Sequence, residues 1–552
     1  MRDIFSSNYA SLGLTTLALS SCFALALGCA TRPVADDGET LGEGDSGETS
    51  AGGGDGNGDG DTTEVPQGKR ARGIHLTEVE ANQGTAILIG KDGAWVGPEE
   101  RNAFMIRDRD TLIRTQHVVD DDWIPREITG VLHLRDADGV ELGVRTRELF
   151  VEGPSDPKSL GSEFYFSILA DEAQPGLSYW VELIDTSEVD ASELSEGTNV
   201  TPEDYELVGY EQTPLEMKVM FVPIHYTYID PPTLVEPTDE DLQYVSDDLL
   251  QNNPLQSVSY ELHEVYEYDN QLTNLGALLS PMAALRANDA ADPNVYYHAL
   301  VDVNGPAVNM VAGIAQLTGE SKSGASSRVA ATVWFKSPPD TPPVGSSGTI
   351  VHEIGHNQGL QHVFCPQAAT EAASPDPNYP HEGGKIGVYG FGIRSFKLYT
   401  PTAAHDYMTY CGNAWVSDWT WNKTYRRIRI LTEWDYEGAP GGEGALAPNV
   451  PLLVGTLFPD GTEDWWVMMG PAPSVEEIGA EHRIALGQDG ELVDELYTSV
   501  SLLSDNATVV VTAALTVPVT EVEAIVRVDE QGESHPIALE SIHVDRGVKL
   551  GL

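Results

Sequence analysis

Residues 352–362 read HEIGHNQGLQH and place three histidines within eleven positions of a chain that has 14 in 552. His352 and His356 are four positions apart, so on a helix they share a face and their rings can converge. Gly359 falls where a left-handed residue would end that helix and could return His362 toward the other two rings. Three neutral imidazoles and one water make the open tetrahedral site that is typical of catalytic zinc. We therefore expect one zinc ion, Zn²⁺, at this motif.

Glu353 follows the first histidine and should point about 100° around the helix from it. In that position it could take a proton from water as the water attacks a carbonyl. The alternative, surface histidines on an amphipathic helix, would account for a bare HExxH, because short motifs match by chance. The eleven-residue form with Gly359 and His362 is much harder to produce by accident.

A second motif lies downstream, where HDYMTYC occupies residues 405–411 with Met408 at its centre. Together the two motifs resemble the metzincin clan of zinc endopeptidases, whose pattern is HExxHxxGxxH followed by a methionine turn beneath the metal. The resemblance implies an α+β metzincin catalytic domain with a mixed sheet, a zinc helix and a methionine turn. The implied roles are zinc ligation for His352, His356 and His362, and general base for Glu353.

Two residues of the second motif take roles from the same resemblance. Met408 is implied as the apolar floor of the site, although a methionine alone more often fills a core. Tyr410 matches the tyrosine that some metzincins place near the zinc, where it could bind the oxyanion of the tetrahedral intermediate; a core tyrosine is the alternative. The resemblance is strong over residues 352–411 and is most like secreted bacterial multidomain members, including mucin-degrading enzymes of enteric bacteria.

The chain has four cysteines. Cys22 and Cys29 belong to the N-terminal leader, which leaves Cys365 and Cys411 as the one remaining pair. One of the pair follows the third histidine of the zinc motif by three positions, and the other follows the methionine by three. Since the metzincin fold brings these two segments together, the resemblance implies a disulfide; two free buried thiols are the alternative.

The leader, residues 1–29, has Arg2 followed by the apolar run SLGLTTLALSSCFALALG. Polar residues interrupt this run at the extreme N-terminus, which favours a signal peptide over a permanent membrane span. Lipidation at Cys29, where the run ends, is our preferred interpretation; lipidation at Cys22 and an ordinary cleaved signal are the alternatives. We expect an exported protein, held at the outer membrane or cell surface by a lipid anchor or otherwise secreted.

Composition divides the rest of the chain. Residues 30–72 are rich in glycine and acidic residues and should form a disordered linker. Alternating apolar and polar residues predict an immunoglobulin-like β-sandwich over 73–210 and a second β-sandwich over 446–552. The zinc protease domain is expected between them, over 215–440, with a helix that begins at a Thr238 cap.

Net charge limits the partners of this chain. Its 31 basic and 86 acidic residues give −55, a charge that repels nucleic acid phosphates and anionic membranes. The sequence therefore favours a zinc endopeptidase that hydrolyses extracellular proteins or glycoproteins, touching a membrane only through the N-terminal anchor. The alternative is a cell-surface binding or adhesion protein that uses the zinc fold as a scaffold. Glu353 argues against a scaffold, because a retired site could lose its base and keep its metal.

Overall fold

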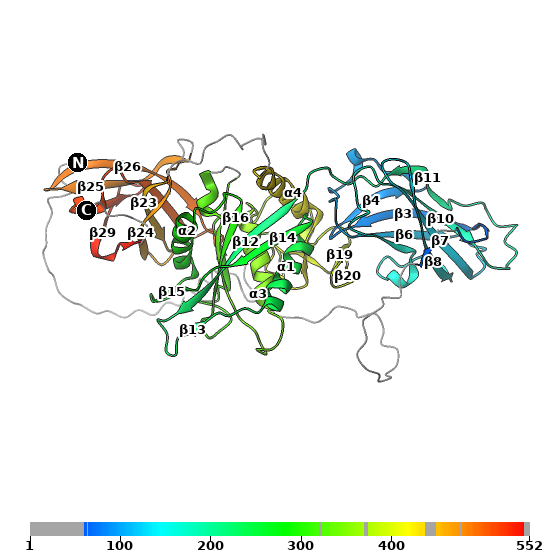
Figure 1. Cartoon of the computed structure of the whole chain (residues 1–552), viewed down its shortest axis with the longest axis horizontal. Coiled ribbons are helices and arrows are strands. Elements are labelled where there is room, and N and C mark those ends of the chain that lie inside the picture. The colour runs from blue at the N-terminus through cyan, green and yellow to red at the C-terminus, as the bar shows by residue number, and fades with distance from the viewer. Residues whose placement is uncertain are drawn as a thin grey trace.

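The computed structural model describes residues 60–62, 65–319, 323–368, 374–435, 449–473 and 477–545. Three bodies follow one another along the long axis, with the blue and cyan N-terminal strands at one end, a green and yellow central body, and the orange and red C-terminal strands at the other end (Figure 1). The predicted signal peptide and both candidate lipidation sites, Cys22 and Cys29, lie outside the described residues. Among the described residues, no helix is both long enough and apolar enough to cross a membrane.

Two β-sheets form the N-terminal body. One sheet has the order β1-β8-β7-β10-β11 with β2 beside β10, and the other has the order β5-β4-β3-β6-β9. Fully buried side chains from both sheets, such as Val79, Phe166 and Tyr179, make the core between them. The strands are β1 (Gly60–Thr62), β2 (Lys69–Arg70), β3 (Ile74–Asn82), β4 (Ala86–Lys91), β5 (Ala94–Trp95), β6 (Thr111–Val119), β7 (Arg126–Arg135), β8 (Glu141–Val151), β9 (Tyr165–Ile168), β10 (Ser178–Asp185) and β11 (Val200–Leu207).

This body starts earlier in the chain than the predicted linker boundary at residue 72. Strand β1 pairs with β8, β2 pairs with β10, and Ala71 is fully buried. The strand order also differs from the predicted immunoglobulin type, because β3, β4, β5 and β6 all stay in one sheet before the chain crosses to the other. The early start could not be predicted, because strands of two or three residues are too short to show alternating apolar and polar residues. The strand order could not be predicted either, because alternation shows which face of a sheet a residue takes but not which strand it pairs with.

The central body is built on a mixed seven-stranded sheet. Strand β12 pairs in parallel with β14, β15 and β16, and β16 pairs in parallel with β18. Strand β17 pairs with β18 antiparallel and lies at the edge of the sheet. The strands are β12 (Glu216–Tyr226), β13 (Thr233–Leu234), β14 (Ser257–Leu262), β15 (Tyr266–Tyr268), β16 (Val295–Val301), β17 (Gly313–Ala315) and β18 (Val329–Val333).

Four α-helices accompany this sheet. The predicted cap is confirmed, because the Thr238 side chain accepts a hydrogen bond from the Asp241 backbone while Asp241 reaches back to Thr238. Between the third and fourth helices, the described residues form strands of two or three residues and one short 3-10 helix, and the fourth helix, capped by Ser417, closes the body. The helices are α1 (Asp239–Asn252), α2 (Leu279–Asn288), α3 (Val344–Asn357) and α4 (Asp418–Glu433), and the short strands are β19 (Gly390–Gly392), β20 (Lys397–Tyr399), β21 (His405–Asp406) and β22 (Ala414–Trp415).

The C-terminal body differs from the expected pair of sheets. Its eight described strands are hydrogen-bonded into one sheet with the order β29-β28-β25-β26-β27-β23-β24-β30. Arg527 on β28 nevertheless donates to Glu463 on β24, so the sheet must curl until strands far apart in its order meet. The strands are β23 (Asn449–Leu457), β24 (Glu463–Pro471), β25 (Ile478–Gln488), β26 (Glu491–Leu502), β27 (Val509–Ala514), β28 (Ala524–Val528), β29 (Ser534–Ile537) and β30 (His543–Val544).

The two faces of this curled sheet have different partners. Leu453, Trp465 and Ile484 face its own core. Leu452 and Trp466, on the opposite face, join one apolar cluster with strands β12, β16, β17 and β18 of the central body. Burial of this outer face therefore ties the C-terminal body to the central body.

Candidate metal centre

Helix α3 carries the first two histidines and is fixed to the sheet at its start. Ser346 donates to the carbonyl of Val333, at the end of β18, and accepts from the backbone N–H of Phe335. The helix ends at Asn357, and Gly359 has φ = 84°, the left-handed conformation predicted for it. A Cβ at Gly359 would lie 2.7 Å from the Arg427 guanidinium, so close packing adds to the requirement for glycine.

The three predicted zinc ligands converge. The Nε2 atom of His356 lies 3.1 Å from Nε2 of His352 and 3.2 Å from Nε2 of His362. Two ligands of a tetrahedral zinc at the usual Zn–N distance are about 3.3 Å apart, so this spacing fits the ion. All three side chains are buried.

Hydrogen bonds on the far side of two rings determine which nitrogen faces the centre. The Nδ1 atom of His352 is 2.8 Å from the carbonyl oxygen of Tyr407, and Nδ1 of His356 is 2.8 Å from that of Leu360. A carbonyl only accepts, so each Nδ1 carries the proton and each neutral ring points an Nε2 lone pair inward. Lone pairs that face each other at 3.1 Å repel, and a cation between them removes the repulsion.

Burial also favours the uncharged form of the His356 ring. The pKa of His356 lies well below its usual value, mainly because the ring is desolvated and secondarily because His362 and His352 are its neighbours. Metal ligation requires the neutral imidazole, so this depression keeps the ring ready to bind a cation near neutral pH.

Glu353 lies on α3 beside the histidines and is fully buried. Its carboxylate packs against strand β17, where a Cβ added at Gly313 would lie 2.7 Å from Oε1. The other oxygen, Oε2, accepts a hydrogen bond of 3.3 Å from the hydroxyl of Ser504, a residue of the C-terminal body. Sequence reasoning found neither neighbour, because nothing local to Gly313 or Ser504 points to the zinc motif.

Met408 packs directly beneath α3. A Cβ added at Gly355 would lie 2.6 Å from its sulfur, so the glycine lets the turn approach the helix backbone. The backbone N–H of Val363 donates to the Met408 carbonyl over 3.0 Å, which joins the turn to the segment after the third histidine. The structure thus brings the two predicted motifs together.

Asp406 anchors this turn and was not singled out from the sequence. Its buried carboxylate accepts from the backbone N–H of Met408 and from both the N–H and the hydroxyl of Ser417, the cap of α4. Desolvation raises the pKa of Asp406 above its usual value, and these hydrogen bonds partly offset the rise. The sequence feature that could have identified Asp406 is its position two residues before the methionine.

Tyr410 lies beside the histidine cluster, next to the inward nitrogen of His362. Its hydroxyl is 2.8 Å from Nε2 of His362, and the two rings meet nearly edge to face with centroids 4.7 Å apart. The side chain is partly exposed, unlike the three histidines. A hydroxyl at the inward nitrogen of a ligand ring can hydrogen-bond an oxygen that reacts there.

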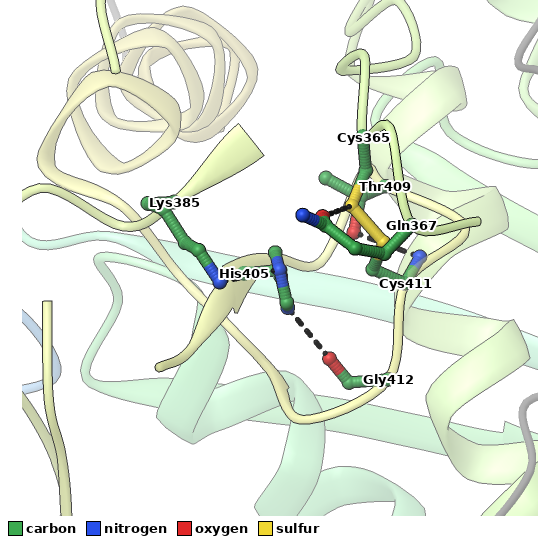
Figure 2. The surroundings of a disulfide bond; sticks show 7 residues. All are labelled: Cys365, Gln367, Lys385, His405, Thr409, Cys411 and Gly412. Carbon is green, nitrogen blue, oxygen red and sulfur yellow. Dashed lines mark hydrogen bonds between the residues drawn. A yellow bond between two sulfur atoms is a disulfide. The ribbon is translucent and has the colours of Figure 1, made fainter. Parts of the chain in front are cut away.

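Cys365 and Cys411 form a disulfide, with Cα atoms 6.2 Å apart (Figure 2). Beside it, His405 accepts from the Lys385 ammonium over 2.7 Å and donates from Nδ1 to the Gly412 carbonyl over 2.9 Å. His405 and the two sulfurs also lie within ligand distance of one another, but oxidised sulfurs offer no thiolate to a metal. The link joins the third-histidine segment to the methionine turn.

Comparisons with known proteins return little. No family model matches the chain, and no curated protein matches it. Among solved structures, a calcium-binding mutant of beta-glucuronidase 2 from Bacteroides uniformis is 9% identical with a TM-score of 0.12, over 42% of this chain and 29% of that one. A candidate beta-galactosidase from Bacteroides fragilis is 9% identical with a TM-score of 0.14, over 86% of this chain and 74% of that one. The chain thus spans less than a third of the first structure, and likenesses this weak carry no argument about its fold or function.

Proposed function

We propose that this protein is a zinc-dependent endopeptidase of metzincin type that hydrolyses extracellular proteins or glycoproteins. The observation that carries the proposal is the convergence of three buried Nε2 atoms while the far nitrogens of two of the rings donate to backbone carbonyls. A histidine cluster kept only for packing would gain nothing from turning three Nε2 atoms toward one point, whereas a cation bound there would accept a lone pair from each ring.

His352, His356 and His362 would hold the metal in the proposed reaction. Zinc bound there would polarise the scissile carbonyl and acidify water. Glu353 would take the proton of the attacking water and pass it to the leaving amine. The Tyr410 hydroxyl would donate a hydrogen bond to the oxyanion as the carbonyl carbon becomes tetrahedral.

We also propose that the protein is exported and that its substrates belong to a particular charge class. A disulfide beside the site suits an oxidising compartment, in keeping with the predicted leader. The strongly acidic chain would repel polyanionic glycans, so we propose protein or glycoprotein substrates whose cleaved region is neutral or basic.

The test is a comparison of the wild type with Glu353→Gln on a diverse peptide library, with zinc measured in both proteins. We expect about one zinc per chain in both and a turnover lower by at least roughly 10²-fold in the variant. Glu264→Gln, an exposed glutamate on the surface, is the matched control and should behave as the wild type. Normal cleavage by Glu353→Gln would refute the mechanism, and full zinc with no cleavage by any form would favour the scaffold alternative.

A further inference from the structure

Strand β17 is the edge strand of the central sheet, and a segment of the C-terminal body pairs with its outer side. The backbone N–H of Ser504 donates to the Ala315 carbonyl over 2.8 Å, and the Ala315 N–H donates to the Ser504 hydroxyl over 3.0 Å. The next residues along, Gln316 and Leu503, form an antiparallel bridge. Residues 503–504 therefore lie along β17 as a short added strand.

The same segment reaches the proposed general base. The Ser504 hydroxyl, which accepts from Ala315, donates to Oε2 of Glu353 over 3.3 Å. Ser504 is 1% exposed and Glu353 fully buried, so the contact is closed to solvent. One side chain from the C-terminal body thus touches both the sheet edge and the carboxylate beside the metal ligands.

Apolar packing and a preformed turn hold the segment in place. Leu503 is fully buried in the cluster shared with the central body, and its Cδ1 would lie 3.2 Å from a Cβ added at Gly276. Its backbone N–H donates to the Thr508 carbonyl over 2.9 Å. The Asp505 carboxylate accepts from the N–H groups of Ala507 and Thr508, which rigidifies the tip between β26 and β27.

We propose that residues 503–504 are an intramolecular inhibitor of the zinc site, which lowers peptide cleavage by the full-length protein until its C-terminal body is displaced. This inference rests on the proposed function. An unpaired sheet edge binds an extended peptide through main-chain hydrogen bonds, and one edge takes one occupant. A segment tethered in the same chain competes at an effective concentration of about a millimolar or more. Substrate therefore competes poorly with it, and Glu353 is engaged by Ser504 while the segment is docked.

Leu503→Asp tests this inference in the full-length protein. The charge removes apolar docking while leaving the C-terminal body's own core intact, because Leu503 does not belong to that core. We expect peptide cleavage, as kcat/KM, to rise by roughly ten-fold or more, and hydrogen exchange across β17 to become faster. The matched control is Leu502→Asp, which alters an exposed neighbour and should change neither.

A locked variant supplies the opposite test. Residues paired across antiparallel strands lie close enough for a disulfide, so Gln316→Cys combined with Leu503→Cys should hold the segment on β17 when oxidised. We expect the oxidised form to be inactive and the reduced form to cleave, with each single cysteine variant as the control for the reductant. Equal cleavage by both forms would overturn the inference.

Hydrogen exchange separates failure of this inference from failure of the proposed function. Faster exchange of β17 in Leu503→Asp without cleavage by any form supports docking of the segment and refutes the protease. Cleavage by the wild type at the rate of Leu503→Asp, with faster exchange only in the variant, refutes inhibition and leaves the protease standing. Unchanged exchange in the variant also overturns the inference.

Discussion

At the scale of single residues, the centre depends on hydrogen bonds that point away from it. The Tyr407 and Leu360 carbonyls hold the protons of His352 and His356 on Nδ1 and turn each Nε2 lone pair toward the centre, where a cation would bind. Both carbonyls are backbone atoms, so the side chains at these positions can vary without changing this contribution. The histidine spacing was readable from the sequence, whereas these second contacts required the chain reversal at Gly359 and the turn at Met408 to be known.

Tyr410→Phe tests the role of a hydroxyl that lies 2.8 Å from Nε2 of His362. Loss of one donor to an oxyanion lowers turnover by roughly 10²-fold, and we expect this fall in kcat with zinc content unchanged. Peptide turnover under saturating substrate and metal analysis of the same sample are the measurements. A core role would instead lower the melting temperature and leave kcat near the wild-type value.

Glu80, which lies in the N-terminal body and not at the histidine cluster, gives a pH-dependent prediction. Desolvation by burial raises its pKa to about 7, and the charge of Arg114, which is hydrogen-bonded to Glu163, offsets the rise only in part. The folded protein holds this proton where the unfolded chain has lost it, so its contribution to stability is complete below about pH 4.5 and disappears as pH rises through about 7.

Glu80→Gln removes that titration and keeps the shape of the side chain. We expect the variant to gain stability relative to the wild type between pH 5 and pH 8, measured as the free energy of unfolding in urea. Glu99→Gln, which changes an exposed glutamate of the same body, is the control. An unchanged difference across that range would show that Glu80 is already ionised at pH 5.

At the scale of elements, the methionine turn is held by three connections to other segments. Asp406 binds the cap of α4, Val363 donates to the Met408 carbonyl, and Cys411 is bonded to Cys365. The helix at Thr238 and the turn at Gly359 could be predicted because caps and left-handed residues act locally. The edge strands β1 and β2 could not, because only their partners in space define them.

Removing the disulfide with Cys365→Ser and Cys411→Ser should destabilise the fold. The two cysteines are 46 positions apart, and a loop of that length gives a chain-entropy contribution of about 4 kcal/mol. We expect a loss near this size in the free energy of unfolding and faster loss of activity to chelators, since the turn beneath the metal loosens. Alkylation of both cysteines in unreduced, denatured protein would instead show that the bond does not form.

At the scale of the whole molecule, neighbouring bodies are joined by shared apolar cores. One apolar cluster runs from the N-terminal sheets into α1, α3 and α4, and a second joins the central sheet to the C-terminal strands. The sequence predicted a first region of strands, a central region of strands and helices, and a last region of strands, and the structure has its elements in that order. It could not show that Trp465 faces one core and Trp466 another, or that Ser504 reaches Glu353, because such contacts depend on how bodies pack and leave no local pattern.

Arg109 gives the clearest test of rigid packing between the N-terminal and central bodies. It comes from the N-terminal body, yet its guanidinium donates to the carbonyls of Asn253 and Leu255 and lies over the Trp421 ring, 5.1 Å from the centroid. Desolvation lowers its pKa to about 9, so the buried charge is stabilised mainly by these contacts. Arg109→Ala removes the donor that these two buried carbonyls share and should cost roughly 3 kcal/mol or more. By calorimetry, the wild type should unfold with these two bodies in a single transition, and the variant should show the N-terminal body melting separately at lower temperature.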